Sequence, residues 1–416
     1  MKTRNLFIAT LSIVVAVNLT SCRGGGEDGA AVVIEKESFI PRGLPEARDY
    51  ESGELFCFTT DSCGFCVSNM ALRGDKGYRY IVSESNDGGH KWKKLGSGRG
   101  KCRQIEKSGD YVFLETILHG EQDTTVIMRS PVKKFRPKPI LKVKGKINSF
   151  HAFNESTFIY FKQKDNTKGT YRLTTDSGRN WKRVDVPGIM FESPVKYSED
   201  KMYVPLLGGL YIKDINSGKE MFFRKKGMVN PAVSGQRISF SGRDMWEYDG
   251  KHMDKIHDFI SGNIGFIDDY VTGDGDLLVA KGAWSEENKE GKKFTKGSCL
   301  LYSVDGGYSW ESMDKSREKI KSISSIPYKD GIAVICSKSD SKELCIVRIR
   351  KAERTGSPGS KRPLKRLRPT KEIPDSLTEK EFFNFIFGDL TEFYEDNVWK
   401  KSLEDVVKET KKALPD

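Results

Sequence analysis

Short runs of β-branched, aromatic and aliphatic residues recur along most of the chain, and turn-forming residues separate them. Tyr80–Val82, Tyr171–Leu173 and Leu300–Tyr302 are three such runs, and each leads into a segment that contains Asp and Gly. Strand-forming residues that are bounded by Gly, Pro, Asn and Asp predict β-hairpins. Glycine, which occurs 40 times, supplies the backbone conformations that many turns need. The pattern therefore predicts an all-β protein over most of its length.

The C-terminal segment shows a helical pattern instead. Ser376–Glu379 has the form of a capping box after Pro374, and apolar residues then recur at helical spacing to about Leu414. We therefore expect a short α-helical appendage at residues 376–416, preceded by a basic linker at 353–375. The tail either docks on the β domain as a helical pair or serves as a partner-binding arm, because its phenylalanine cluster is too apolar to stay exposed.

One pattern, Ser/Thr-x-Asp-x-Gly-x-x-Trp, occurs three times in the β region. Its fixed positions are Ser85, Asp87, Gly89 and Trp92; Thr174, Asp176, Gly178 and Trp181; and Ser303, Asp305, Gly307 and Trp310. The pattern resembles the Asp-box, or bacterial neuraminidase repeat, and three full matches in one chain indicate a β-propeller.

Turn chemistry explains why these residue types recur together. An Asp side chain at the start of a tight turn accepts hydrogen bonds from backbone N–H groups, Gly supplies a positive φ, and the Ser or Thr hydroxyl closes the hairpin. The Trp fills the space beneath the turn. In propellers that carry the Asp-box, the motif lies on the outer rim of a blade, away from the binding face. We therefore assign these twelve residues a structural role, and we identify no catalytic residue among them.

The spacing of the repeats predicts the number of blades. Asp87 and Asp176 are 89 residues apart, and Asp176 and Asp305 are 129 residues apart. Blades of four strands take roughly 40–50 residues, so one blade without the motif fits in the first gap and two in the second. Degenerate hairpins at 126–131, 210–218 and 245–250 fall near the expected places. We predict a seven-bladed propeller over residues 32–352, with six blades as the alternative.

The first blade carries a second resemblance. Leu55–Phe58, Gly64–Val67 and Ser85–Trp92 are similar in order and type to the repeats of photosystem-assembly-factor propellers. The match covers one blade well and the others loosely. Residues 32–48 could add a strand to the last blade and close the ring, and closure removes exposed strand edges.

The N-terminus has the features of a secreted lipoprotein. Lys2 and Arg4 precede an apolar stretch, Leu6–Leu19, which is too short to span a membrane and is typical of a signal peptide. The stretch ends at Cys22 in a sequence that resembles a bacterial lipobox. We expect a leader at 1–21, diacylation of Cys22, a flexible tether at 22–31, and a location on the bacterial cell envelope, at the outer membrane on its periplasmic or surface face.

Seven cysteines remain besides Cys22, and an oxidising envelope permits disulfides. Cys336 and Cys345 flank a polar stretch that reads as a hairpin tip, so they are the predicted disulfide. Cys63 and Cys66 have the spacing of a thiol–disulfide oxidoreductase motif, but they lie among strands rather than at a helix N-terminus. We favour a local disulfide there, and neither these residues nor the histidines form a motif that predicts a metal or cofactor site.

Charge narrows the choice of partner. The chain has a formal net charge of +12, which becomes +10 once the leader with Lys2 and Arg4 is removed. A basic balance predicts a partner protein with an acidic surface, bound more weakly at high salt. Six of the basic residues lie within 361–371, which we interpret as a solvated, proline-broken linker. Nucleic acid is not an expected partner, because no aromatic residues interleave with these basic ones.

The Asp-box also occurs in sialidases, and that resemblance implies a hydrolytic alternative. Sialidases need three arginines that bind the substrate carboxylate, an Asp that acts as acid and base, and a Tyr nucleophile activated by Glu. Their Phe/Tyr-Arg-Ile-Pro motif supplies the first of the three arginines. The nearest segment here, Phe39–Arg42, lacks the Arg between the aromatic residue and Ile. We therefore expect a non-enzymatic protein-binding propeller, either a scaffold or assembly factor or an inhibitor or immunity protein against an antibacterial enzyme. A glycan-binding protein or sialidase-like glycoside hydrolase is the alternative.

Overall fold

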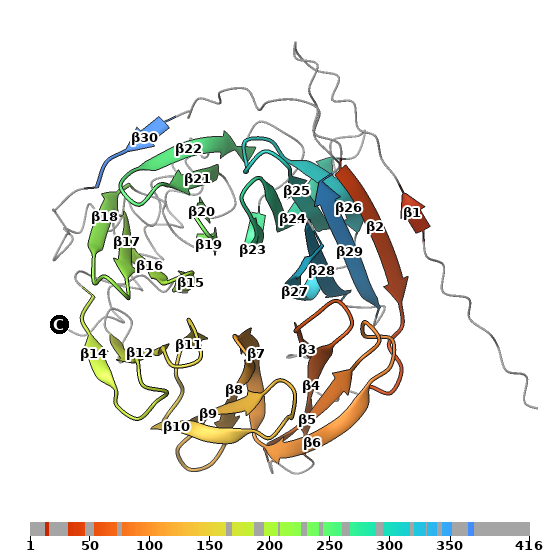
Figure 1. The fold of residues 1–416 in the computed structure, drawn as a ribbon, viewed down its shortest axis with the longest axis vertical. Coiled ribbons are helices and arrows are strands. Elements are labelled where there is room, and N and C mark those ends of the chain that lie inside the picture. The colour runs from red at the N-terminus through yellow and green to blue at the C-terminus, as the bar shows by residue number, and fades with distance from the viewer. Residues whose placement is uncertain are drawn as a thin grey trace, which may run out of the picture.

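Seven small antiparallel sheets follow one another along the chain. The computed structural model describes residues 13–15, 32–45, 54–72, 77–163, 169–186, 195–206, 209–225, 231–240, 244–259, 267–287, 294–316, 320–329, 331–338, 343–351 and 365–369. Figure 1 shows the sheets arranged as blades around a central axis. The all-β class is confirmed, and so is the count of seven blades rather than six.

Blades I to VI are each built from four consecutive strands, and blade VII takes its fourth strand from the N-terminal region. The bounds are β3 (Glu54–Phe58), β4 (Gly64–Ala71), β5 (Tyr78–Ser85) and β6 (Lys93–Arg99) in blade I; β7 (Lys101–Ser108), β8 (Tyr111–Leu118), β9 (Thr124–Pro131) and β10 (Lys138–Lys144) in blade II; β11 (Ser149–Ala152), β12 (Phe158–Gln163), β13 (Gly169–Thr174) and β14 (Lys182–Val184) in blade III; β15 (Lys196–Ser198), β16 (Lys201–Leu206), β17 (Gly209–Asp214) and β18 (Glu220–Arg224) in blade IV; β19 (Pro231–Ser234), β20 (Arg237–Phe240), β21 (Asp244–Tyr248) and β22 (Met253–Asp258) in blade V; β23 (Ile267–Asp274), β24 (Leu277–Glu287), β25 (Phe294–Ser303) and β26 (Glu311–Ser316) in blade VI; and β27 (Ile320–Tyr328), β28 (Gly331–Lys338), β29 (Leu344–Lys351) and β2 (Val32–Phe39) in blade VII.

The hydrophobic core lies between neighbouring blades. Each of seven apolar clusters combines side chains from two adjacent blades, so that one cluster fills each junction of the ring. The second strand of a blade is therefore buried on both faces, as in β4, where every residue from Gly64 to Asn69 is buried. A strand covered on both faces loses the alternation of apolar and polar residues, which explains the continuous apolar runs in the sequence.

The first two strands of a blade join at one end of the central channel. In blades II, IV, V, VI and VII this turn has two residues, and its first residue has φ between +51° and +57°. The residue is Gly in three blades, Glu199 in blade IV and Lys329 in blade VII. Two-residue hairpins of this kind match the twist of the strands that they connect.

The N-terminal strand closes the ring. β2 pairs with β29 along eight residues, from Val32 opposite Lys351 to Phe39 opposite Leu344. Glu37 of this strand lies 3.3 Å from the Arg348 guanidinium and 2.9 Å from Nε2 of His90 in blade I. The expected latch at 32–48 is therefore present, because β2 gives blade VII its outer strand and contacts blade I. A further short strand, β1 (Ile13–Val15), pairs with β2 and falls within the predicted leader.

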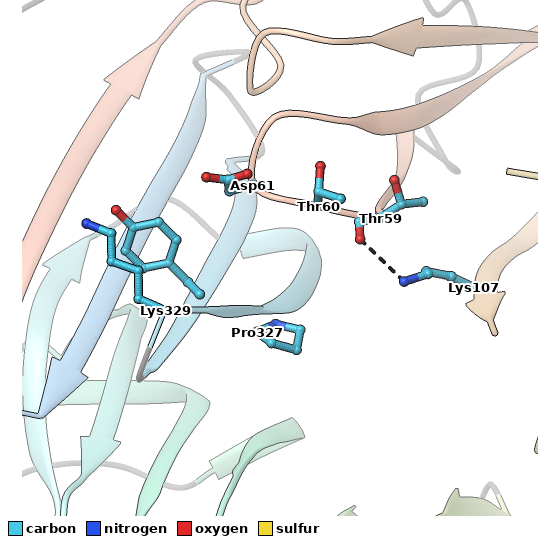
Figure 2. A pocket seen from close by; sticks show the side chains of 7 residues that line it. Thr59, Thr60, Asp61, Lys107, Pro327 and Lys329 are labelled. Atoms are coloured by element: carbon cyan, nitrogen blue, oxygen red, sulfur yellow. Dashed lines mark hydrogen bonds between the residues drawn. The ribbon is translucent and has the colours of Figure 1, made fainter. Parts of the chain in front are cut away.

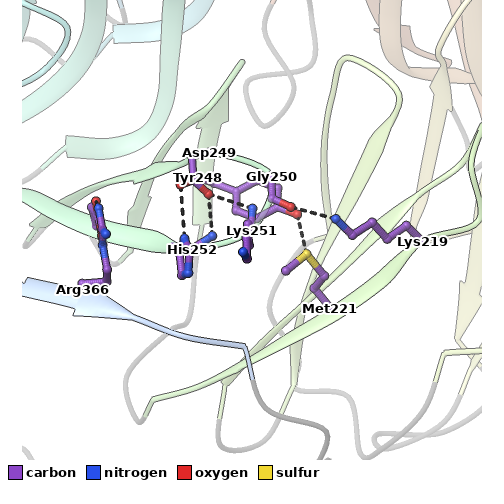
Figure 3. A network of polar contacts seen from close by, with 9 residues as sticks. Lys219, Met221, Tyr248, Asp249, Gly250, Lys251, His252 and Arg366 are labelled. Atoms are coloured by element: carbon purple, nitrogen blue, oxygen red, sulfur yellow. Dashed lines mark hydrogen bonds and ion pairs between the residues drawn. The ribbon is translucent and has the colours of Figure 1, made fainter.

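Part of the predicted basic linker is a strand. β30 (Lys365–Leu367) pairs with β22, and the Arg366 guanidinium binds both carboxylate oxygens of Asp254 at 2.7 and 2.6 Å. Figure 3 shows β30 beside the turn of blade V that contains Asp249 and His252. The residues of β30 are largely exposed, as expected of a solvated segment, and they form a fifth strand on blade V. The expected helical tail at 376–416 lies outside the described residues.

Candidate functional site

The three sequence repeats form the turns between the third and fourth strands of blades I, III and VI, and we call them the Asp turns. In blade I the Ser85 hydroxyl donates to Asp87 (2.9 Å) and accepts the Gly89 N–H (2.9 Å), while Asp87 accepts the Lys91 N–H (2.8 Å). The Trp92 indole N–H donates to the Gly89 carbonyl at 2.7 Å. The same four hydrogen bonds recur in the other two turns. In blade III they are Thr174 to Asp176 (2.7 Å), Gly178 to Thr174 (3.0 Å), Asn180 to Asp176 (2.9 Å) and Trp181 to Gly178 (3.1 Å). In blade VI they are Ser303 to Asp305 (2.8 Å), Gly307 to Ser303 (2.8 Å), Ser309 to Asp305 (2.9 Å) and Trp310 to Gly307 (3.0 Å).

The acids of these turns are engaged within the turn itself. The backbone N–H of Asn180, followed by the Thr174 hydroxyl and the Asn180 amide, lowers the pKa of Asp176 to about 2. Hydrogen bonds to an ionised carboxylate favour the charged form. An acid that remains ionised and is held in this way is a poor proton donor near neutral pH, so the geometry gives Asp176 the role of a turn residue.

Each Asp turn is also bonded to the first hairpin of its own blade. The backbone N–H groups of Gly88, Ser177 and Gly306 donate to the carbonyls of Ser62, Ser156 and Asp276 at 2.8, 2.9 and 2.8 Å. The same link recurs in three further blades as Val132 to Asp110, Ile215 to Asp200 and Tyr248 to Gln236. The two turns at this end of a blade therefore support each other. The resemblance to the Asp-box implied a motif that lies away from the binding face, but the Asp turns lie at the same end of the blades as the inner hairpins that line the hollow described next.

Three of these inner segments enclose an open hollow of about 410 Å³ (Figure 2). It lies where the first hairpins of blades VII and I meet the end of β7 in blade II. Its lining residues are Thr59, Thr60, Asp61, Lys107, Pro327, Tyr328 and Lys329. Lys107 reaches across from blade II, and its Nζ donates to the Thr59 carbonyl of blade I at 3.3 Å.

Two cationic side chains lie near the ring of Tyr328, which is one of the lining residues. The Lys329 ammonium lies 5.1 Å from the centre of the Tyr328 ring, and the Arg348 guanidinium lies 5.6 Å from it. Both positions are within the range in which a cation is attracted to a ring face. Of the charged side chains that line the hollow, two are lysines and one is Asp61, so the lining carries a formal charge of +1.

A second group of polar residues lies along the innermost strands of blades II, III and IV. Glu106 accepts the Ala152 N–H at 2.7 Å and lies 3.5 Å from Nδ1 of His151. The His151 ring stacks on Tyr197 with centroids 4.8 Å apart, and the Tyr197 hydroxyl is 3.1 Å from Ser149 Oγ. Both oxygens of Glu106 have partners, since Gln104 Nε2 donates to the second at 2.8 Å. The group therefore joins three blades across their inner strands.

One acid beside this group is buried. Glu115 on β8 is 3% exposed, and its Oε1 lies 3.3 Å from the Arg103 guanidinium. Burial raises the pKa of Glu115 to about 7, against the opposing attraction of Arg103 and with a further contribution from Glu106. A carboxyl with this pKa changes its charge near neutral pH, which makes it relevant to the pH dependence of stability.

The described innermost strands bring no cluster of arginines together at the centre of the ring. Arg103 is the one arginine on the innermost strands that the structure describes, and it is paired with Glu115. Within the described ranges, no group of three or more His, Cys, Asp or Glu side chains is placed to hold a metal ion. No helix in the described part of the chain has the length and apolar character that crossing a membrane requires.

The cysteines are mostly buried thiols. Burial raises the pKa of both Cys57 and Cys102 to about 12, and it raises the pKa of Cys66 well above the ordinary value. A thiol with a raised pKa is a weak nucleophile and a poor metal ligand. Cys336 and Cys345 are direct partners across β28 and β29, and the structure describes both as thiols rather than as a disulfide. Cys22 lies outside the described residues.

The hollow is the part of the site that sequence reasoning missed. Its residues come from the ends of three inner strands, and Thr59 and Lys329 are 270 positions apart. One feature of the sequence could have pointed to it: Lys329 stands at the left-handed turn position where three other blades have glycine. That position can be recognised only when the register of the hairpin is known.

Fold and site together define a seven-bladed β-propeller protein with a weakly cationic hollow at one end of its channel. The chain matches no protein-family model, and no curated protein matches it.

Several solved structures are similar to the chain at low sequence identity and with TM-scores below 0.5. An acylaminoacyl peptidase of Pyrococcus horikoshii is 14% identical with a TM-score of 0.46, over 67% of this chain and 48% of the peptidase. A PL25 ulvan lyase is 11% identical with a TM-score of 0.43, over 70% and 90%. A Trypanosoma rangeli sialidase is 11% identical with a TM-score of 0.38, over 71% and 55%. This chain spans about half the length of the peptidase and of the sialidase, and the likeness concerns the fold alone.

Proposed function

We propose that this chain is an envelope lipoprotein whose propeller is a non-enzymatic protein-binding module. The observation that carries the proposal is the hollow beside Lys107 and Lys329, which residues of three blades line within a closed ring. A propeller presents many loops around one concavity, which suits recognition more than it dictates chemistry. The lining of the hollow contains neither a cysteine nor a serine–histidine pair from which nucleophilic catalysis could be built.

The proposed location in the cell envelope rests on the N-terminal sequence. A short basic segment, an apolar stretch and Cys22 at the expected cleavage point support a cleaved leader and a lipid anchor. Residues 22–31 then tether the propeller, which begins with Val32 of β2. The protein would stand on the envelope, at the outer membrane, with its channel mouth available to a partner.

Two kinds of partner fit this proposal. A scaffold or assembly factor would hold a component of an envelope complex, in keeping with the resemblance of blade I to photosystem-assembly-factor repeats. An inhibitor or immunity lipoprotein would capture an antibacterial enzyme that reaches the envelope. Both would bind a protein with an acidic surface, because the chain is basic and the lining of the hollow has a formal charge of +1.

A glycan ligand is the second candidate. The group of Gln104, Glu106 and Tyr197 on the inner strands combines an amide, a carboxylate and an aromatic ring, which are the groups that sugar sites use. The resemblance of the Asp turns to the Asp-box keeps sialidase-like hydrolysis within this alternative. Glycan-array binding and hydrolysis of a fluorogenic sialoside would support it if wild-type protein gave signal and a Glu106→Gln variant did not.

The protein-binding proposal is tested by affinity purification of the tagged protein from its own membranes in mild detergent, followed by mass spectrometry. We expect one protein at near-equal stoichiometry, and we expect it to be lost at high salt. Cys22→Ala is the matched variant, because it removes the lipidation site and leaves the propeller sequence intact. Recovery of the tagged protein without any stoichiometric companion would contradict the proposal and favour the glycan alternative.

A further inference from the structure

We propose that the outer edge of blades I and II docks on the anionic headgroups of the membrane that anchors the chain. The surface consists of exposed basic side chains of β6, of β10 and of the turn that leads into β10. We call it the basic rim, and its members are Lys93, Lys94, Arg99, Lys133, Lys134, Arg136, Lys138, Lys142 and Lys144. The inference rests on the proposed envelope location and goes beyond it, because it assigns one side of the propeller to the bilayer.

The segments that build the basic rim contain no acidic residue. No Asp or Glu occurs at 88–105 or at 124–154, and the second range includes both β10 and its neighbour β9. Beside β6 the neighbouring acids are Glu84, which is opposite Lys93 in the ladder, and Asp87, which is engaged within its own turn. The positive charge of the rim is therefore largely uncompensated.

Protection of strand edges does not by itself explain this composition. Lysine on an outer strand discourages edge-to-edge pairing with another chain, and each blade has an outer strand to protect. The outer strands β18, β22, β26 and β2 each have one or two acids beside a single Lys or Arg. In contrast, β6 and β10 each have three basic residues and no acid. The excess on two neighbouring blades indicates an anionic surface as the ligand.

The two halves of the basic rim form one surface. Blades I and II follow each other in the ring, and Figure 1 shows β6 and β10 along the same side of its outer edge. Phe135, in the turn that leads into β10, packs on Phe65 of blade I with ring centroids 5.4 Å apart. The backbone N–H of Arg136 donates to Ser130 Oγ at 2.6 Å, which holds the same turn on blade II. The cations of this turn therefore lie at the junction of the two blades.

The kind of cation and its distribution favour lipid headgroups over a folded partner. Seven of the nine residues are lysines, whose ammonium groups attract anions as point charges and need no paired geometry of the kind that arginine forms with a carboxylate. Mobile headgroups can follow a convex strand edge, and an anionic leaflet attracts clustered Lys and Arg within about a Debye length.

The proposed anchor is attached beside the basic rim. The tether at 22–31 leads into β2, which is the outer strand of blade VII and contacts blade I, because Glu37 lies 2.9 Å from Nε2 of His90. An acyl anchor and a basic surface reinforce each other at a membrane. Docking through the outer edge would also leave the hollow at the end of the channel uncovered.

The test measures how the mature chain without its lipid, residues 23–416, partitions onto vesicles of phosphatidylcholine with or without phosphatidylglycerol. We expect binding only where phosphatidylglycerol is present, and we expect high salt to abolish it. The triple variant Lys94→Gln/Lys138→Gln/Lys142→Gln should lower the partition coefficient at least about tenfold. Among the described residues no ion pair involves these three lysines, so the variant should keep its fold, and thermal unfolding checks this.

The matched control is Lys219→Gln/Lys251→Gln/Lys365→Gln, which removes the same charge from exposed positions on the side of blades IV and V (Figures 1 and 3). It should change the partition coefficient by less than about twofold. Because Lys365 belongs to the basic segment at 361–371, this control also tests whether that segment binds the vesicles. In the full-length, lipidated protein in its own membranes, amine labelling should be slower at Lys94 and Lys142 than at Lys219 and Lys251.

Three results would overturn the inference. Wild-type protein could fail to bind vesicles that contain phosphatidylglycerol, the rim variant could bind them as wild-type protein does, or the control variant could lose binding instead. If the rim variant binds vesicles normally but no longer recovers the partner in the affinity purification, the rim is a protein surface and not a lipid surface. Vesicle binding requires no partner, so this inference and the protein-binding function can fail separately.

Discussion

At the level of single residues, two of the turns beside the channel have a charged residue at a left-handed backbone position that favours glycine. Glu199 and Lys329 have φ +51°, where three other blades place glycine. The left-handed region costs an L-residue roughly 1–2 kcal/mol, whereas glycine adopts it freely but loses more conformational entropy on folding. These two effects oppose each other, so the net effect of a substitution to glycine is small.

We therefore expect Glu199→Gly to raise the free energy of unfolding by up to about 1 kcal/mol, because relief of the left-handed strain exceeds the added entropy cost. The lost ion pair with Lys201 is partly exposed and contributes little. Urea unfolding followed by tryptophan fluorescence measures the change. A decrease of more than about 1 kcal/mol would show that the Glu199 side chain is needed for the fold rather than only tolerated.

Glu115 predicts how stability depends on pH. Its pKa is about 7 in the folded protein because the carboxyl is buried, and the ordinary value is 4.5. The folded state therefore binds more protons than the unfolded state between these values, and its stability must fall as the pH rises through this window. The contribution of Glu115 is complete below about pH 4.5 and is lost above about pH 7.

For this group alone we expect a fall of about 2–3 kcal/mol in the free energy of unfolding between pH 5 and pH 8. Glu115→Gln should remove that part of the pH dependence, because an amide cannot ionise. Chemical denaturation of both proteins across this range isolates the effect, since the histidines are the same in each. Parallel pH profiles for the two proteins would mean that Arg103 keeps Glu115 ionised throughout.

At the level of strands and turns, the sequence predicted those turns that are formed by contacts between residues close together in the chain. The three Asp turns and the degenerate turns at Asp214 and Asp249 follow third strands, where the sequence placed hairpins. β30 could not be predicted in this way, because its sequence, Lys-Arg-Leu, has no strand pattern of its own and becomes a strand by pairing with β22 and by the contact of Arg366 with Asp254. Such partners are far apart in the chain and leave no periodic signal.

The hairpin of β28 and β29 carries a further prediction. Cys336 and Cys345 are direct cross-strand partners, and the Cα separation of such pairs lies within the range that a disulfide spans. In protein isolated from an oxidising envelope we expect a disulfide here, formed when the two thiols lose two hydrogen atoms to the oxidant. Mass spectrometry of non-reduced peptides measures it, and the same digest after reduction is the control. Alkylation of both residues without prior reduction would contradict it.

At the level of the whole molecule, the ring depends on a strand from the other end of the chain. The sequence predicted seven blades from the spacing of its repeats and placed a closing strand at 32–48, where β2 is found. The hollow was beyond prediction, because three blades must be brought side by side before Thr59, Lys107 and Lys329 become neighbours. The spacing of the sequence repeats therefore predicts the number of blades, whereas the hollow can be recognised only once the ring of blades has closed.

Removal of residues 32–39 should destabilise the entire propeller. The β29 edge would lose its partner, Val32 would no longer be buried at the junction of blades VI and VII, and Phe39 would no longer be buried at the junction of blades VII and I. We expect thermal unfolding to begin at least ~10 °C lower, in line with a loss of several kcal/mol. Removal of residues 23–31, which precede β2, is the matched control and should leave the transition unchanged. Equal unfolding temperatures for both truncations would mean that blade VII is stable with three strands.

The position of β2 also decides how the molecule would respond to mechanical load. In an anchored chain, tension between the membrane and a partner held by the propeller enters at Val32, directly after a tether of about ten residues. The force then acts along β2, so that the eight-residue ladder with β29 is sheared as a unit rather than opened one bond at a time. The strand that closes the ring would thus also carry the tension between the anchor and the partner. The ring would remain closed until the hydrogen bonds between β2 and β29 break together.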